Sequence, residues 1–484
     1  RRAELELVVP ETLDAAAREA LPERGVHPFR ITEQRGDETV VRDIWASLVL
    51  SSGERSERLD FPDELSFEDR EFRLAFALQR LATGEPTRVA FVSDLPRLSP
   101  AEAHEEFQLR MKFAPSGTDV YSLARASLER AGFEVIHVDT RPSPPGSSYI
   151  ELPPDLDALV WLQPRRDITY VLEALTRYLH GGGRAVLFAQ HFNVQAERHR
   201  GRGFDLAFWP QPQSADIEVL WLPELGVELE RSILFDELSF PAPIRAEVNR
   251  SADERDYDAQ VLALPFQIRA SNANFAPGPI LRGVGDQAFL WGNAIELDHD
   301  ALERSGLEAE VLIETSPRSW SDDWQGGFVD PERIAGPADG AFDGPRPLAA
   351  RIHGRFPLPD EPLRQPFDGE SPPLPPPPGA GELTLVGASE PLKNEWILGP
   401  EFRGDQLLIN LVAHAALDSD LAALTGRRRV PRGLDAASPD ERLLWRAVVI
   451  GGGPLGVGLA GLLASLFAAR RVRRRAVDLA GRAA

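Results

Sequence analysis

The sequence predicts an α/β protein with a Rossmann-like parallel sheet, a second mixed α/β region and one C-terminal transmembrane helix. Two observations lead to this fold class. Between residues 86 and 240, short apolar segments alternate with amphipathic segments, a pattern typical of parallel strands covered by helices on both faces. Near the end of the chain, residues 448–469 carry no charged side chain and are long enough to cross the roughly 30 Å hydrocarbon layer as a helix.

Composition narrows the classes of function. The chain has 484 residues, 43% of them hydrophobic, which is enough to bury large cores. Its formal net charge of −22 argues against nucleic acid as a partner, because the phosphates would be repelled. The sequence contains no cysteine, so disulfides, thiolate metal sites and cysteine nucleophiles are all excluded.

Residues 1–85 are expected to form an N-terminal α/β segment that is truncated at its front. Its predicted elements are a strand at 5–9, a helix at 12–20, a strand at 40–50, and a helix that begins near Ser66 and ends at Gly84. Because the chain opens at Arg1 and Arg2 without a hydrophobic leader, we expect further residues upstream.

Residues 86–240 are expected to form the Rossmann-like domain. Apolar runs predict strands at 88–92, 133–138, 158–162 and 185–189. Helices are predicted between them at 120–131, ended by Gly132, and at 168–179, ended by the three glycines 181–183. The strands at 158–162 and 185–189 are apolar on both faces, so we expect them to be central and buried.

Residues 241–430 are expected to form the second mixed α/β region. Strands are predicted at 259–268, 287–295, 308–314, 349–356 and 382–387, and an amphipathic helix at 404–417. Prolines are so dense within 357–379 that we expect an exposed, polyproline-like loop there, which serves either as a passive spacer or as a docking peptide.

A transmembrane helix is expected at 443–469, with a cytoplasmic basic tail at 470–484. The alternative for the uncharged run is a buried core helix. The residues that set the expected orientation directly follow the run and are Arg470, Arg471, Arg473, Arg474 and Arg475. Because positive charge favours the cytoplasmic side, the bulk of the chain is expected outside the cytoplasm, anchored in the cell membrane. The spacing of Gly452 and Gly456 fits a close-packing face against another membrane helix.

The ends of the predicted parallel strands are the first place to look for a ligand site. The segments that follow the strands are Ser93-Asp94, Asp139-Thr140, Gln163 to Arg166, and Gln190-His191. None of them is a glycine-rich loop that opens a helix, and the sequence has no Walker-type Gly-Lys-Ser/Thr motif, so we expect no nucleotide cofactor. The glycines at 181–183 precede a strand, which indicates a helix stop.

Histidines and carboxylates give no predicted metal site. His191 and His199 lie eight positions apart, and Asp298, His299 and Asp300 would alternate faces in a strand. We expect both groups to be solvated surface residues. Ser93 and Asp94 with His191 would suggest a hydrolase, but the sequence has no Gly-x-Ser-x-Gly nucleophile elbow. The sequence therefore predicts no catalytic residue, cofactor or metal.

Several strings resemble a known family. They are FALQRLATGEPTRVAF at 76–91, the DALVWLQP and LTRYLHGGGRAVLFA strings within 156–189, VLIETS at 311–316, PLAARIHG at 347–354, and the helix at 404–417. The chain resembles the auxiliary component of uncharacterised ABC transport systems of the gliding-motility type, whose outer region is similar to an amidotransferase-like domain of an intraflagellar transport protein. At 385–394 the sequence LVGASEPLKN departs from the family's Asp-Ser-Asp-Phe-like pattern. Amidotransferases of this kind act through a cysteine, so the resemblance implies their fold and not their activity.

These observations predict a non-catalytic, membrane-anchored, extracytoplasmic accessory subunit of an ABC-type exporter. The resemblance implies an ABC permease as the partner in the membrane and, through it, a cytoplasmic ATPase. Two alternatives remain open: a free-standing surface protein that binds a cell-wall or polysaccharide ligand, and an uncharacterised hydrolase.

Overall fold

The computed structural model describes residues 7–35, 38–61, 69–94, 97–110, 118–140, 149–165, 169–198, 206–249, 255–324, 326–327, 329, 336–337, 340–359, 363, 374–399 and 402–427. All of them belong to the first of two compact units, Arg1–Arg429; the second is Val430–Ala484. The expected membrane helix with Gly452 and Gly456, and the five arginines of the tail, lie outside the described residues. Within the described ranges, every helix falls short of the length and hydrophobicity that a bilayer span requires.

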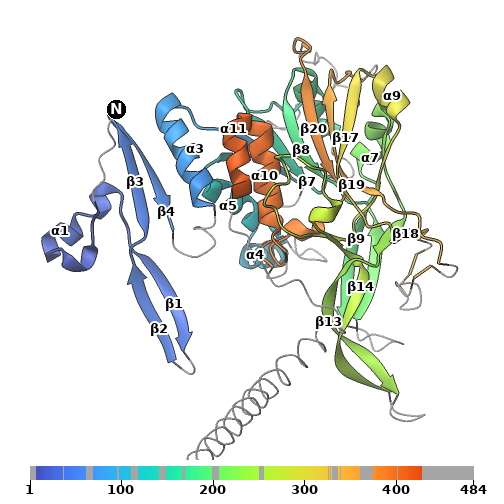
Figure 1. The fold of residues 1–484 in the computed structure, drawn as a ribbon, viewed down its shortest axis with the longest axis horizontal. Helices are drawn as coiled ribbons and strands as arrows, with labels where there is room; N and C mark the ends of the chain where they lie inside the picture. The colour runs from blue at the N-terminus through green and yellow to red at the C-terminus, as the bar shows by residue number, and fades with distance from the viewer. Residues whose placement is uncertain are drawn as a thin grey trace, which may run out of the picture. The chain divides into compact units, whose positions relative to one another are not determined.

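The N-terminal part consists of two antiparallel hairpins preceded by short helices (Figure 1). Its elements are η1 (Pro10–Thr12), α1 (Ala15–Glu19), η2 (Pro22–Arg24), β1 (Phe29–Arg35), β2 (Glu38–Ile44), β3 (Ser47–Ser52) and β4 (Arg55–Asp60). The helix expected at 12–20 is present but shorter, as α1. The single strand expected at 40–50 is wrong: it is two strands, because the first half pairs with β1 and the second with β4. In the described part of 5–9, residues 7–9 form no strand.

A seven-stranded, mostly parallel sheet is the main element of the fold. Its order is β17-β19-β20-β8-β7-β5-β6, parallel from β20 to β6 and antiparallel at β17 and β19. The strands are β5 (Arg88–Ser93), β6 (Glu134–Val138), β7 (Ala158–Leu162), β8 (Arg184–Phe188), β17 (Leu307–Glu314), β19 (Pro347–Gly354) and β20 (Gly381–Val386). Both expected regions, 86–240 and 241–430, therefore supply strands to this sheet.

The centre of the sheet is dry on both faces, as the apolar runs predicted. Every residue of β7 is buried, and its bounds are the predicted ones. Val160 faces the cluster that contains α5 and α10, while Trp161 faces the cluster that contains α6. Burial of both alternating faces is what makes a strand apolar throughout its length.

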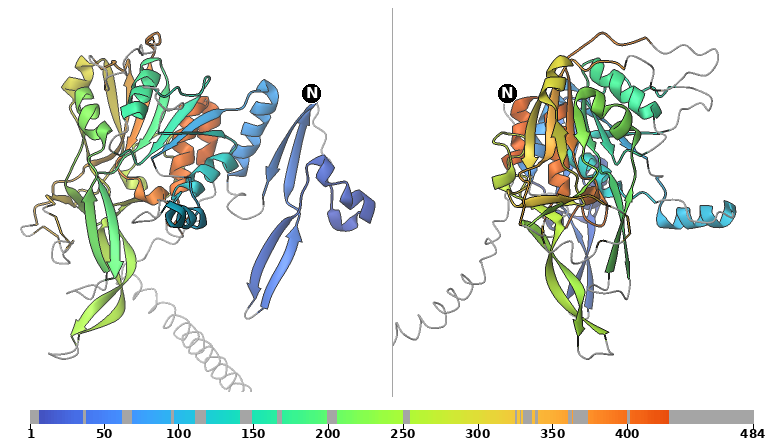
Figure 2. Two further views of the ribbon diagram at one scale, coloured as in Figure 1. Left: turned by 180° about the vertical axis from the view of Figure 1, so that it is seen from behind. Right: turned by 90° about the vertical axis from the view of Figure 1, so that its right-hand side faces the viewer.

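Helices cover both faces of the sheet (Figure 2). One layer contains α3 (Arg70–Thr83), α5 (Ser122–Ala131), α10 (Gly404–Ala416), α11 (Ser419–Ala422) and η6 (Ala423–Arg427). The other contains α6 (Thr169–His180), α7 (Asp216–Leu220), α8 (Leu222–Leu225) and α9 (His299–Arg304). Gly84 and Gly132 end α3 and α5 in the left-handed conformation, which confirms both predicted stops. α3 buries Phe72 and Phe76 against the sheet and leaves Leu78 51% exposed.

A second, β-rich part packs around stacked aromatic rings. The rings of Phe266 and Trp291 lie 4.0 Å apart, with Phe208 edge-on to Phe266. Its strands are β9 (Phe192–Arg198), β10 (Leu206–Pro212), β12 (Ile233–Asp236), β13 (Ser239–Asn249), β14 (Arg255–Ala270), β15 (Gln287–Leu290) and β18 (Ser319–Asp322). A separate pair of short strands, β11 (Val227–Leu229) and β16 (Ile295–Leu297), packs with the helix layer that contains α6. The strand expected at 287–295 is thus two strands, interrupted where Trp291 adopts a positive φ of 56°. The remaining elements are α4 (Pro100–Arg110), η3 (Asn272–Asn274) and η5 (Glu390–Leu392).

Candidate functional site

The carboxyl ends of β5 and β7 form the switch point of the parallel sheet. After β5 the chain passes to β6 on one side, whereas β7 and β8 follow on the other side. Loops leave such a pair of strands in opposite directions, which creates the crevice where open α/β sheets bind ligands. The strand ends singled out in the sequence, Asp94, Gln163 and Gln190, meet at this edge.

Asp94 is the titratable group closest to the switch point. Its carboxylate accepts hydrogen bonds from the backbone N–H of Arg165 at 2.7 Å and from Trp161 Nε1 at 3.3 Å. Burial raises the pKa of Asp94 to about 7, and the two hydrogen bonds oppose this shift only in part. Asp94 therefore ties β5 to the end of β7 and is partly protonated near neutral pH.

Gln163, directly after β7, adopts a strained backbone conformation. Its φ is +52°, in the left-handed region that residues other than glycine rarely adopt. Its N–H donates to the carbonyl of Phe188. In α/β hydrolases, a strained turn between a strand and a helix holds the nucleophile. Here that turn holds a buried amide, which cannot attack a substrate.

The crevice above these residues is filled by the chain itself. We call residues 387–395, which follow β20, the closing segment. The N–H groups of Ser389 and Glu390 both donate to Gln190 Oε1, at 3.0 and 3.1 Å, and the Ser389 hydroxyl donates to Gln163 Oε1. Gln163 Nε2 in turn donates to the carbonyl of Gln190 at 3.0 Å. The closing segment therefore occupies the place where a ligand would contact the strand ends.

Asn394 fixes the far end of the closing segment to the start of α5. Its Oδ1 accepts from the N–H of Leu123 at 2.9 Å, and its Nδ2 donates to the Asp119 carbonyl at 2.9 Å and to Ser122 Oγ at 3.0 Å. A side-chain oxygen that accepts from the first turn of a helix acts as a cap. Asn394 supplies this cap from a distant part of the sequence, so it holds the segment across the sheet edge.

His191 is buried, and its expected surface position is wrong. Its Nδ1 lies 2.9 Å from Glu218 Oε2 on α7, and the side chains are 5% and 1% exposed. The backbone N–H of His191 donates to Asn293 Oδ1 at 2.9 Å. A buried histidine needs such partners to offset the loss of water, and they come from segments far away in the sequence. Glu218 was not predicted, because α7 gives no sign of facing His191.

The other candidates from the sequence have structural roles. The Asp298 side chain caps α9 by accepting from Ala301 N, so Asp298, His299 and Asp300 begin a helix and do not alternate along a strand. Gly182 has a positive φ of 91° after α6, as expected for a helix stop. His199 lies outside the described residues. Across the described ranges, no three His, Asp or Glu side chains are grouped as a metal site requires.

This geometry holds the described sheet edge closed, and the Ser389 hydroxyl there is used in a hydrogen bond to Gln163. The residues at the edge are paired with one another or with the closing segment, and a pocket of about 550 Å³ beside Lys393 and Asn394 opens outside it. Lys393 Nζ is itself paired with Glu390 at 2.5 Å. The described edge therefore supports a structural role for the strand ends.

Comparison with protein families gives a match over the described sheet. A family model described as ABC-type uncharacterized transport system matches residues 86–396, which is more than half of the chain. In the same comparisons, no curated protein and no solved structure matched the chain. The matched range includes all seven strands of the central sheet and the closing segment.

Proposed function

Because the chain belongs to the family of auxiliary proteins of ABC-type uncharacterized transport systems, we propose that it is a non-catalytic, membrane-anchored subunit whose folded part lies outside the cytoplasm. The observation that carries the proposal is the family match over residues 86–396, which makes the chain an auxiliary component of an ABC-type transport system. Such a component depends on an ATPase for energy, and we assign ATP hydrolysis to another subunit.

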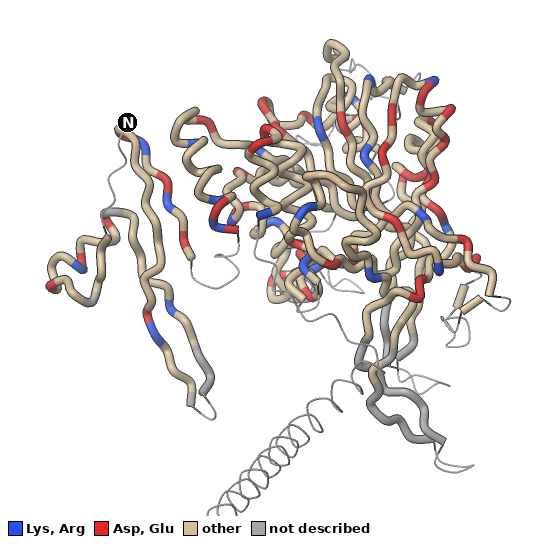
Figure 3. Tube along the Cα trace, viewed as in Figure 1, with Lys and Arg blue, Asp and Glu red and all other residues tan. Residues whose placement is uncertain are grey.

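The closed sheet edge supports a role without catalysis. Gln163 occupies the strained position after β7, and the closing segment covers it. The sequence also contains no cysteine to act as an amidotransferase-type nucleophile. Figure 3 shows Lys and Arg intermixed with Asp and Glu along the described trace, and such mixed charge does not favour a nucleic-acid backbone as the partner.

The proposed membrane attachment rests on the sequence of residues 443–484. The uncharged run at 448–469 has the length of a membrane helix, and the following arginines favour a cytoplasmic tail. A protease added outside intact spheroplasts should therefore digest the region before about residue 442 and spare the tail. Cleavage of the tail alone would reverse the proposed orientation.

We expect residues 448–469 to contact the permease through Gly452 and Gly456. Glycines four residues apart lie on one face of a helix and let two backbones approach closely. Replacing both with Leu should reduce co-purification of the permease and ATPase from the native host in mild detergent. A matched control replaces Gly458 and Gly461 with Leu, because at about 100° per residue these two lie on the opposite face.

The two double variants distinguish a specific interface from general damage to the helix. Loss of partners only with Leu at 452 and 456 supports the proposal. Equal loss of partners in both variants would contradict a specific packing face at Gly452 and Gly456. Recovery of the wild-type chain without a permease or ATPase would contradict the proposed transporter assembly.

A further inference from the structure

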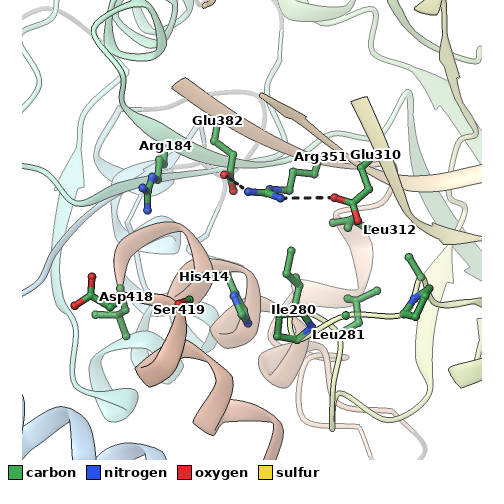
Figure 4. A pocket seen from close by; sticks show the side chains of 15 residues that line it. Arg184, Ile280, Leu281, Glu310, Leu312, Arg351, Glu382, His414, Asp418 and Ser419 are labelled. Atoms are coloured by element: carbon green, nitrogen blue, oxygen red, sulfur yellow. Dashed lines mark hydrogen bonds and ion pairs between the residues drawn. The ribbon is translucent and has the colours of Figure 1, made fainter. Parts of the chain in front are cut away.

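A pocket of about 420 Å³ lies where the helix layer ends on one face of the central sheet (Figure 4). α10 covers β7 and β8 but ends at Ala416, so the neighbouring strands β20, β19 and β17 are left without a helix there. Besides Leu312, these strands present charged side chains to the pocket. The pocket floor is a row of alternating charge across four strands: Arg184, Glu382, Arg351 and Glu310.

The row is held together by ion pairs centred on Arg351. Arg351 Nη2 lies 2.7 Å from Glu382 Oε2, and Nη1 lies 3.6 Å from Glu310 Oε2. Arg184 Nη1 donates to the Ala415 carbonyl at 3.1 Å, near the C-terminal end of α10, where a positive charge is favourable. Glu310 remains about half exposed, so its oxygens face open space in the pocket.

The opposite wall contains His414 and the loop 276–280. His414 bonds to Pro279, and since proline has no N–H, the imidazole must donate to the proline carbonyl. Burial lowers the pKa of His414, which favours the neutral ring. Among the described residues, no group bonds to His414 Nε2, and none bonds to Arg351 Nε. Both atoms are themselves buried, so the exposed charged groups of the pocket, and not these two atoms, are open to a ligand.

The mixture of charges decides which ligands fit. Glu310, Glu382 and Asp418 would repel an anion, while the guanidinium groups of Arg184 and Arg351 would repel a cation. A hydroxyl group suits both, because it donates to a carboxylate and accepts from a guanidinium. Pro277, Pro279, Ile280 and Leu417 add an apolar wall, and the volume lies within the range of small-molecule sites.

We propose that this pocket binds a neutral, polyhydroxylated ligand, such as one or two sugar units of a saccharide. The proposal concerns the described fold alone, and it holds whether or not the chain contacts a permease. It gives the auxiliary subunit a means of recognising a substrate outside the central crevice, which the closing segment fills.

Binding can be tested by thermal unfolding of the full chain in a detergent without a sugar head group. Glucose, galactose, N-acetylglucosamine and maltose are titrated separately, with inorganic phosphate and free arginine as charged comparisons. A bound ligand raises the unfolding temperature saturably, whereas exclusion of sugar from the protein surface raises it without saturation.

Glu310→Gln and Asp418→Asn remove the charged acceptors and should each weaken sugar binding about tenfold, the effect of losing one hydrogen bond to a charged group. Asp43→Asn is the matched control, because Asp43 pairs with Arg30 on the N-terminal hairpin, away from the pocket. Saturable binding of one sugar that is weakened only by the pocket variants supports the proposal. Saturable binding of phosphate or arginine in place of sugar would overturn it, as would sugar effects that are identical in all variants.

Discussion

Replacing Asn394 with alanine should detach the closing segment from α5. The side chain makes three hydrogen bonds, to Leu123 N, the Asp119 carbonyl and Ser122 Oγ, at 2.9, 2.9 and 3.0 Å. Loss of a helix cap costs about 1 kcal/mol, and each further hydrogen bond about 0.5–1.5 kcal/mol. We therefore expect Asn394→Ala to lower the free energy of unfolding by about 2–4 kcal/mol, which lowers Tm by about 2–4 °C in a unit of this size.

The measurements are thermal unfolding and hydrogen exchange followed by mass spectrometry. Amides of 118–131 and 387–399 should exchange faster, while those of β7 and β8 keep their protection, because the sheet does not depend on the cap. Glu395→Ala is the control, since Glu395 is exposed beside Asn394 and its loss should change stability by less than about 0.5 kcal/mol. A similarly small effect of Asn394→Ala, or faster exchange spread evenly over the chain, would refute this reasoning.

Two further predictions concern the sheet. In denaturant titrations, Val160→Asp and Leu187→Asp should each lower the free energy of unfolding by about 3–5 kcal/mol, because an unpaired charge enters a site that is 0% or 1% exposed. The control Leu78→Asp, at a 51% exposed position of α3, should lower it by about 0.5 kcal/mol or less. The raised pKa of Asp94, about 7 against an ordinary 3.8, means that the folded state holds the proton more tightly. The protonated Asp94 therefore stabilises the folded state, by at most about 4 kcal/mol, below about pH 4, and this stabilisation is lost as the pH rises to about 7. Asp94→Asn should flatten the decline in the free energy of unfolding over that range. Pairs of unfolding curves at pH 5 and 8 check this, and parallel pH profiles for wild type and variant would contradict it.

Strands whose two faces are both buried could be predicted from the sequence. β7 has the predicted bounds, and β5 and β8 differ from the prediction by one residue at most at each end, because a run that is apolar on both faces is stable only when both faces are buried. The half-buried edge strand β6 also begins only one residue later than predicted. Helix ends were predicted where a glycine takes a positive φ, as at Gly132. These signals are local, so a single sequence is enough to reveal them.

The site could not be predicted, because its pairings join distant segments. His191 is an ordinary loop histidine until Glu218 on α7 and Asn293 come within hydrogen-bonding distance of it. The sequence predicted no role for the turn at 385–394, yet Asn394 within it caps a helix that lies about 270 positions earlier in the chain. The row of charges beyond the end of α10 could not be predicted either, since it depends on the order in which β8, β20, β19 and β17 pair.

The closing segment also determines where a ligand can bind with useful affinity. To open the crevice, the chain must break the bonds of Ser389 and Glu390 to Gln190, that of Ser389 to Gln163, and those of Asn394. Even four such bonds at about 1 kcal/mol each make opening cost about 4 kcal/mol, so about one molecule in a thousand is open. A crevice ligand would then bind about a thousandfold more weakly than its contacts allow. The pocket beside His414 carries no such cost, which makes it the better place in this chain for the proposed ligand.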